Sequence, residues 1–290
     1  MSDRAPGDAS RTWLKHGRDA GRGTDEQSKV VRLLSEIRDR VLAGAQLRPG
    51  QAVLDLGAGT GLLASEALRR VAPNGTVFAL DQSQSALAEI SVPPDSDPSR
   101  LRCIVGDAHR IQLASGTVDA VLTRSVLIYL DDLTAVLGEI ARVLRPGGRL
   151  SVFEPINSRR RHDANLVGMT DEELAAIEAL RAQSSMAVPA MMAFDENQLI
   201  TAVNAAGLTV VARETESVTE QLADHGAVDA YLRRAPHPGA PSPVELLTAG
   251  LGVAVARRYV TAWHHALEQA APRGGITFST PVLYLTAVLQ

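Results

Sequence analysis

Apolar residues follow two alternating patterns along the chain. Short uninterrupted apolar runs, typical of strands buried on both faces, are followed by segments in which apolar residues recur every three or four positions, as on an amphipathic helix. This alternation predicts an α/β fold in which helices cover both faces of a mostly parallel sheet. The expected strands are residues 52–56, 76–80, 101–105, 118–123, 149–153, 208–215 and 277–288, and the expected helices include residues 24–44, 132–144 and 195–206.

The first expected strand leads into a glycine-rich loop, in the run Q-A-V-L-D-L-G-A-G-T-G-L-L-A from Gln51 to Ala64. Three glycines spaced by two allow a sharp turn and let a ligand approach main-chain N–H groups with no Cβ in the way. The order differs from the dinucleotide pattern G-x-G-x-x-G, because Leu62 stands where the third glycine belongs. The loop predicts a ligand-binding strand-loop-helix, and by itself it leaves a dinucleotide site or a plain tight turn open.

Acidic residues follow the next two expected strands. Asp81 comes about twenty residues after the glycine loop, where a carboxylate can accept hydrogen bonds from both hydroxyls of a ribose. Asp107 follows the third strand, directly after Gly106. Either residue alone is often just a helix cap. Two of them on consecutive strands behind a glycine loop favour a ligand site.

A third motif spans Leu137 to Glu154 and reads L-G-E-I-A-R-V-L-R-P-G-G-R-L-S-V-F-E. It predicts a helix, a Pro-Gly-Gly stop and a strand. Together with the D-x-G-x-G-x-G pattern that begins at Asp55 and the two acidic residues, this run resembles the class I S-adenosylmethionine-dependent methyltransferases. The resemblance covers residues 47–154, in the right order and at the right spacing.

The resemblance implies a Rossmann-like, seven-stranded sheet with strand order 3-2-1-4-5-7-6, in which strand 7 is antiparallel. It also implies S-adenosyl-L-methionine as the cofactor and S-adenosyl-L-homocysteine as the product. Asp81 would accept from the ribose and Asp107 from the adenine amino group. The cofactor-binding residues that it implies are Asp55, Gly57, Ala58, Gly59, Gly61, Asp81, Gln82, Asp107, Ala108, Arg124 and Ser125.

The expected domain organisation places this core at residues 24–154, behind a flexible tail and lid at residues 1–23. Residues 155–194 form a cap insertion, and residues 195–290 complete the sheet around a second insertion at 217–275. We expect the segment Trp13–Arg18 and the first insertion to close over bound cofactor. Methionines suit an adaptable apolar pocket there, although filling a core is their commoner use. The insertion carries Met169, Met186, Met191 and Met192.

The composition of the chain limits the kinds of binding partner that we expect. The chain has 290 residues, 29 Lys and Arg against 33 Asp and Glu, and a net charge of -4, so it has no overall field for gathering nucleic acid. A single cysteine, Cys103, and the lack of a long apolar run favour a cytoplasmic protein without a membrane span. The stretch 123–126 lacks the Asp that metal-dependent relatives use for Mg²⁺, so no metal is expected. A small molecule is the favoured substrate, of the secondary-metabolite or quinone type, and the sequence does not determine the oligomeric state, for which a homodimer is one candidate.

Methyl transfer needs a general base only if the acceptor is a hydroxyl or an acidic carbon. The sequence offers His162 and Glu154 near the end of the fifth strand, and Tyr129 and His16 in the expected lid, as candidates for that catalytic role. Two other functions stay open: a protein of the same fold that binds S-adenosylmethionine without transferring methyl, and a nicotinamide-dependent oxidoreductase.

Overall fold

The computed structural model describes residues 24–185, 191, 194–235 and 240–290. These residues form two compact units. The sheet unit consists of the described parts of Val30–Ser158, Ala193–Glu216 and Pro281–Gln290. The helical unit consists of the described parts of Met1–Lys29, Arg159–Met192 and Ser217–Thr280.

A mixed sheet carries the fold, and its first five strands are parallel. The strands are β1 (Ala52–Leu56), β2 (Thr76–Asp81), β3 (Leu101–Val105), β4 (Val118–Arg124), β5 (Leu144–Pro155), β6 (Arg161–His162), β7 (Leu208–Leu222) and β8 (Ile276–Leu289). Their order is β3-β2-β1-β4-β5-β8, and both β6 and β7 pair with β8. Strand β8 runs antiparallel to β5. The α/β class and the Rossmann-like strand order implied by the family resemblance are therefore confirmed.

The expected number of seven strands is wrong, because the described residues form eight. The extra strand, β6, has two residues, Arg161 paired with Ser279 and His162 paired with Phe278, and two residues are too few to show a period. Strand β5 begins at Leu144, ahead of the expected Arg149, since Leu144 pairs with Val118 before the register shifts.

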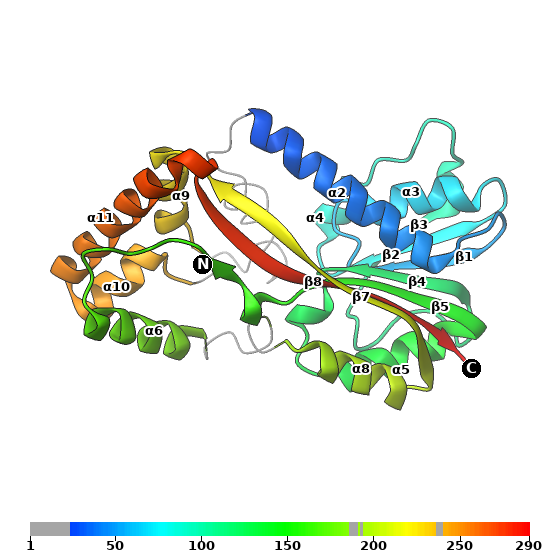
Figure 1. Cartoon of the computed structure of the whole chain (residues 1–290). Helices are drawn as coiled ribbons and strands as arrows, with labels where there is room; N and C mark the ends of the chain where they lie inside the picture. The colour runs from blue at the N-terminus through cyan, green and yellow to red at the C-terminus, as the bar shows by residue number, and fades with distance from the viewer. Residues whose placement is uncertain (1–23, 186–190, 192–193, 236–239) are drawn as a thin grey trace, which may run out of the picture. The chain divides into compact units, whose positions relative to one another are not determined.

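Helices cover both faces of the sheet unit (Figure 1). Helices α2 (Thr24–Ala45) and α3 (Leu62–Val71) lie on one face, and α5 (Leu133–Val143) and α8 (Glu196–Ala205) lie on the other. The short α4 (Gln84–Leu87) follows β2, and single 3₁₀ turns lie at η2 (Pro98–Arg100), η3 (Leu127–Tyr129) and η4 (Asn157–Arg159). Helix α5 begins where predicted, because the Asp132 carboxylate accepts a hydrogen bond from the Ala135 N–H at 2.9 Å.

The helical unit has a core of its own. It contains α6 (Asp171–Ser185), α9 (His225–Arg233), α10 (Pro243–Leu251), α11 (Val253–Ala270) and the 3₁₀ turn η5 (Ala271–Arg273). Helix α6 begins with a capping box, since Thr170 and Glu173 exchange hydrogen bonds at 3.1 Å in each direction. Trp263 and Tyr259 of α11 are fully buried, and the Trp263 ring stacks on Phe278 with 6.0 Å between centroids.

Candidate cofactor site

The glycine-rich loop between β1 and α3 contains three glycines with positive φ, which differ in the space around them. At Gly57 (φ 72°) a Cβ would lie 2.2 Å from Cγ2 of Val126, and at Gly61 (φ 88°) one would lie 2.6 Å from Cγ2 of Ile90. At Gly59 (φ 53°) nothing lies within 4 Å of the Cβ position. Two of the glycines are therefore required by packing, whereas the third leaves open space in front of the backbone.

Asp55, in β1, is hydrogen-bonded to the start of the helix that follows the loop. Its carboxylate is 1% exposed and accepts a hydrogen bond from the Ala64 N–H, in the first turn of α3, at 2.8 Å. Burial raises the pKa of Asp55 to about 7, although the hydrogen bond from Ala64 and the charge of Arg124 act in the opposite direction. Asp55 therefore acts first as an internal anchor for the start of α3.

Asp81, at the end of β2, lies beside the open part of the loop. Its Oδ2 accepts from the Gly59 N–H at 2.9 Å, and its Oδ1 accepts from the Ser83 N–H at 2.8 Å. The next residue, Gln82, is exposed. The structure thus joins the acidic end of the second strand to the one loop glycine that faces open space.

Asp107 follows β3 and is about half exposed. Its Oδ1 accepts from the His109 N–H at 2.9 Å and lies 2.8 Å from His109 Nδ1, and these contacts lower the pKa of the Asp107 carboxyl. Ala108 between them is buried. His109 belongs to none of the sequence motifs, and the only signal for this contact was the tendency of Asp to accept a hydrogen bond from the N–H two residues on.

The turn after β4 carries Arg124 and Ser125. Ser125 has a φ of 55°, which is uncommon outside glycine, and its N–H donates to the Phe153 carbonyl at 2.9 Å. Glu154, at the end of β5, is fully buried, and its Oε1 accepts from the N–H groups of Val126 and Leu127 at 2.9 Å each. Burial raises the pKa of Glu154 to about 7, against the effect of these hydrogen bonds and of the Arg124 charge.

The four catalytic candidates belong to different parts of the chain. Tyr129 is half exposed and ends the η3 turn that Glu154 supports. His162 belongs to the helical unit, where its ring centroid lies 4.9 Å from that of Trp263, and burial lowers its pKa. His16 lies outside the described residues, as do the rest of the Trp13–Arg18 segment and Met186 and Met192. Of the other insertion methionines, Met169 packs against the core of the helical unit and Met191 is buried.

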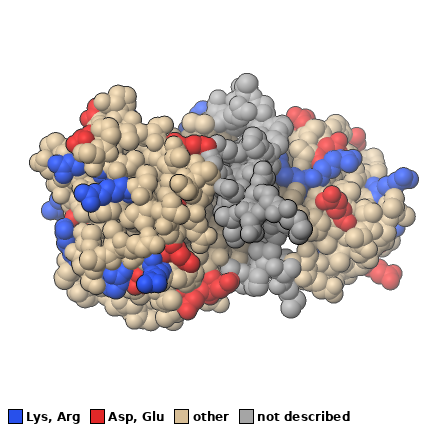
Figure 2. Space-filling view, turned by 180° about the vertical axis from the view of Figure 1, so that it is seen from behind, with Lys and Arg blue, Asp and Glu red and all other residues tan. Residues whose placement is uncertain are grey.

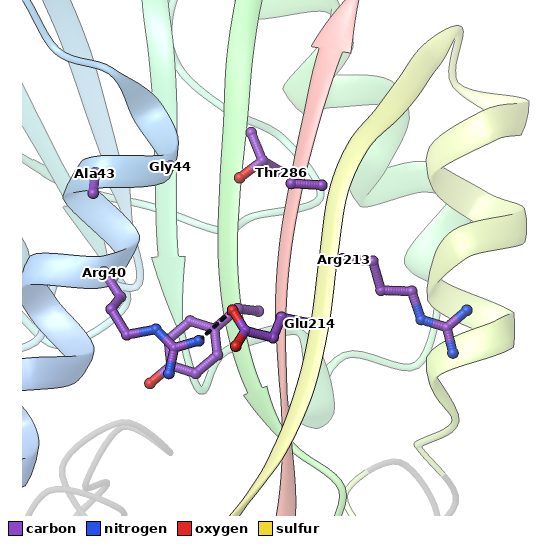
Figure 3. Close-up of a pocket in the computed structure, with 8 residues that line it drawn as sticks. Arg40, Ala43, Gly44, Arg213, Glu214 and Thr286 are labelled. Carbon is purple, nitrogen blue, oxygen red and sulfur yellow. Dashed lines mark hydrogen bonds and ion pairs between the residues drawn. The ribbon is translucent and has the colours of Figure 1, made fainter.

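A separate hollow of about 400 Å³ lies in the sheet unit between α2 and strands β7 and β8 (Figure 3). Arg40 crosses it, with its guanidinium 3.5 Å from the Tyr284 ring centroid and 2.7 Å from Glu214. Arg40 also pairs with Glu216. None of the described cofactor or catalytic candidates lines this hollow. Arg213, which also lines it, pairs with Glu196 at 3.1 Å.

The described part of the chain has few features that are typical of sites for other ligand classes. No group of three or more His, Cys, Asp or Glu side chains there is arranged to hold a metal ion. No helix among these residues is both long and apolar enough to cross a membrane. On the face shown in Figure 2, the described basic side chains are interspersed with acidic ones.

Comparison with known proteins identifies the class. Residues 54–152 match the model of the methyltransferase domain. Demethylmenaquinone methyltransferase of Corynebacterium glutamicum (strain R) is 39% identical over 118 residues, which cover 40% of this chain and 47% of that protein. A candidate methyltransferase of Bacillus halodurans C-125 has a TM-score of 0.54 at 13% identity and covers 87% of this chain and 97% of its own. For geranyl diphosphate methyltransferase in complex with SAM, the TM-score is 0.50 at 17% identity, with 96% and 95% of the chains covered.

The chain therefore carries a methyltransferase domain, and its sheet has the fold of the class I S-adenosylmethionine-dependent methyltransferases. The chain spans only about a third to a half of the length of the curated relatives that it matches. The matched stretch contains the glycine loop and the acidic ends of β2 and β3, and it stops two residues before Glu154.

Proposed function

We propose that this chain transfers a methyl group from S-adenosylmethionine to a small organic molecule, of the secondary-metabolite or quinone type. One observation carries the proposal: the Asp81 carboxylate is hydrogen-bonded to Gly59, the loop glycine whose Cβ position is open. A carboxylate beside a loop with open space in front of its backbone suits a ligand with two features. The ligand donates hydrogen bonds from two hydroxyls to the carboxylate, and it places a neighbouring group against the loop. The similarity to a demethylmenaquinone methyltransferase supports a quinone-like acceptor.

The residues present fit the cofactor. Asp81 would accept from the ribose hydroxyls, the loop from Gly57 to Gly61 would receive the amino-acid end, and Asp107 would accept from the adenine amino group. Asp107 is suited to accept because its carboxyl has a lowered pKa and is about half exposed. Arg124 and Ser125 would border the cofactor from the turn after β4.

When bound, the cofactor supplies an electrophilic methyl group on a sulfonium. The chain then has to hold the acceptor in line with that methyl group and exclude water, and such positioning can provide most of the acceleration. A hydroxyl or acidic carbon acceptor would in addition need a base within hydrogen-bonding reach. Tyr129 and His162 remain candidates for this role, and His16 remains a prediction from the sequence.

The proposal is tested by calorimetry with S-adenosylhomocysteine. Wild-type protein should bind, and Asp81→Ala should bind about tenfold to a hundredfold more weakly, because a charge-assisted hydrogen bond contributes about 1.5 to 3 kcal/mol. Asp95→Ala is the matched control: Asp95 belongs to the same unit, and its side chain is 71% exposed. Equal affinities of Asp81→Ala and wild type would contradict the assignment.

Binding alone does not separate a methyltransferase from a protein that only holds the cofactor. Wild-type protein with labelled S-adenosylmethionine and an extract of its own host, enriched in quinols, should form S-adenosylhomocysteine and a labelled organic product. Binding without any product would favour the non-transferring alternative. A rise in melting temperature with NADH, without one from S-adenosylhomocysteine, would favour the oxidoreductase.

A further inference from the structure

Glu154 is a buried carboxyl that the proposed reaction does not use. It is the last buried residue of β5, with no exposed surface, and its Oε1 accepts from two consecutive main-chain N–H groups, those of Val126 and Leu127. Among the described residues, its Oε2 has no hydrogen-bond partner and is equally buried. A general base must reach the proton that it removes, and Glu154 presents no surface from which to do so.

The turn that Glu154 holds has an unfavourable backbone. Ser125 occupies the left-handed region at φ 55°, which a residue with a Cβ adopts at a cost. The Ser125 N–H donates a hydrogen bond to the Phe153 carbonyl. The N–H groups of the next two residues donate to the Glu154 carboxylate. The end of β5 therefore compensates for the strain of the turn after β4.

The same turn is fitted against the glycine loop. A Cβ on Gly57 would lie 2.2 Å from Cγ2 and 3.2 Å from Cβ of Val126, so the Val126 side chain occupies the space that the missing Gly57 side chain leaves. At the other end of the turn, the Tyr129 N–H donates to the Val126 carbonyl at 3.0 Å. The position of Val126 thus links Glu154 to the loop on one side and to Tyr129 on the other.

We propose that Glu154 is a positioning residue, which holds the turn from Ser125 to Tyr129 against the glycine loop, and that it is not the general base. The link to catalysis rests on the proposed function, since it requires the loop to bind S-adenosylmethionine. The structural role of Glu154 is independent of the proposed function. It requires only that the N–H groups of Val126 and Leu127 depend on the Glu154 carboxyl for their hydrogen bonds.

Two variants separate positioning from base catalysis. Glu154→Gln keeps an oxygen for both N–H groups but cannot take up a proton, whereas Glu154→Ala removes the acceptor. Hydrogen exchange of the Val126 and Leu127 amides, measured without any cofactor, should accelerate at least about tenfold in Glu154→Ala and stay close to wild type in Glu154→Gln. Affinity for S-adenosylhomocysteine should fall about tenfold in Glu154→Ala and remain within about twofold of wild type in Glu154→Gln.

The turnover number and its pH dependence complete the test. A positioning role predicts that Glu154→Gln keeps both the kcat and the acid limb of the pH profile. A loss of about a hundredfold or more in kcat for Glu154→Gln, with unchanged affinity and a lost acid limb, would identify a base and overturn the proposal. Accelerated exchange in Glu154→Gln would overturn it as well, even if Glu154→Ala does not fold. If wild-type protein fails to bind S-adenosylhomocysteine, the proposed function fails, and the exchange comparison still decides the role of Glu154.

Discussion

Alanine at Gly57 and at Gly59 should affect this protein differently, although the two glycines lie two residues apart and both have positive φ. An alanine in the left-handed region costs about 1 to 2 kcal/mol at either position. At Gly59 this is the whole cost, because the new methyl group meets no atom within 4 Å. At Gly57 the methyl group lies 2.2 Å from Cγ2 of Val126, and such overpacking adds about 1 to 3 kcal/mol.

Thermal unfolding measures the difference. For a domain of this size, 1 kcal/mol corresponds to roughly 2 to 4 °C, so Gly59→Ala should lower the melting temperature by about 5 °C and Gly57→Ala by about 10 °C. Saturating S-adenosylhomocysteine should raise the melting temperature of wild type, since a ligand at a hundred times its Kd stabilises by about 2.7 kcal/mol.

Gly59→Val separates folding from binding. Its melting temperature without ligand should be somewhat lower than that of Gly59→Ala, since a branched side chain resists the positive φ of this position even though the space in front of it is open. The shift with S-adenosylhomocysteine should disappear, because the branched side chain fills the cofactor's path. Equal melting temperatures of Gly57→Ala and Gly59→Ala would refute the packing argument. A full ligand shift in Gly59→Val would show that the open space is not the binding path.

Two further predictions concern pH and the helical unit. The folded-state pKa values of Asp55 and Glu154 are raised from 3.8 and 4.5 to about 7, so both carboxyls favour folding below their ordinary pKa, and this contribution is lost as the pH rises towards 7. In urea unfolding, Asp55→Asn should therefore gain stability over wild type between pH 4 and pH 7.5, by up to about 4 kcal/mol, and a constant difference would contradict the raised pKa. Trp263→Ala should remove about 3 to 5 kcal/mol from the core of the helical unit, seen as a melting temperature lower by about 10 °C, with calorimetric affinity for S-adenosylhomocysteine within about twofold of wild type. A larger loss of affinity would show that the helical unit contributes to cofactor binding.

The parts of the site that depend on neighbouring residues could be predicted from the sequence. Asp81 was expected to take part in the site because it ends a strand about twenty residues after the glycine loop, and the structure places its carboxylate 2.9 Å from the Gly59 nitrogen. The order of the strands followed from the family resemblance and holds. Both predictions, the place of Asp81 and the order of the strands, rest on the spacing of motifs within residues 47–154. In this stretch the local sequence pattern is consistent with the overall fold.

Contacts between distant residues left no comparable signal. Glu154 was interpreted as a base because it follows a strand, and only the structure shows that it receives the N–H groups of Val126 and Leu127, earlier in the chain by 28 and 27 residues. Arg40 and Glu214, 174 residues apart, likewise meet only in the folded protein. Ion pairs of this kind depend on the sheet order, and no periodicity in the sequence encodes them.

The pairing of β8 with β5 has a consequence for the order in which the sheet folds. Strands β1 to β5 pair with one another within residues 52–155. Strand β8 instead pairs Val288 with Arg149 and Val282 with Pro155, so this contact has to close the long segment of chain between β5 and β8. Closing a longer segment costs more chain entropy, and such non-local strand pairings form slowly. We therefore expect the glycine loop and the acidic end of β2 to form before the edge of the sheet is complete.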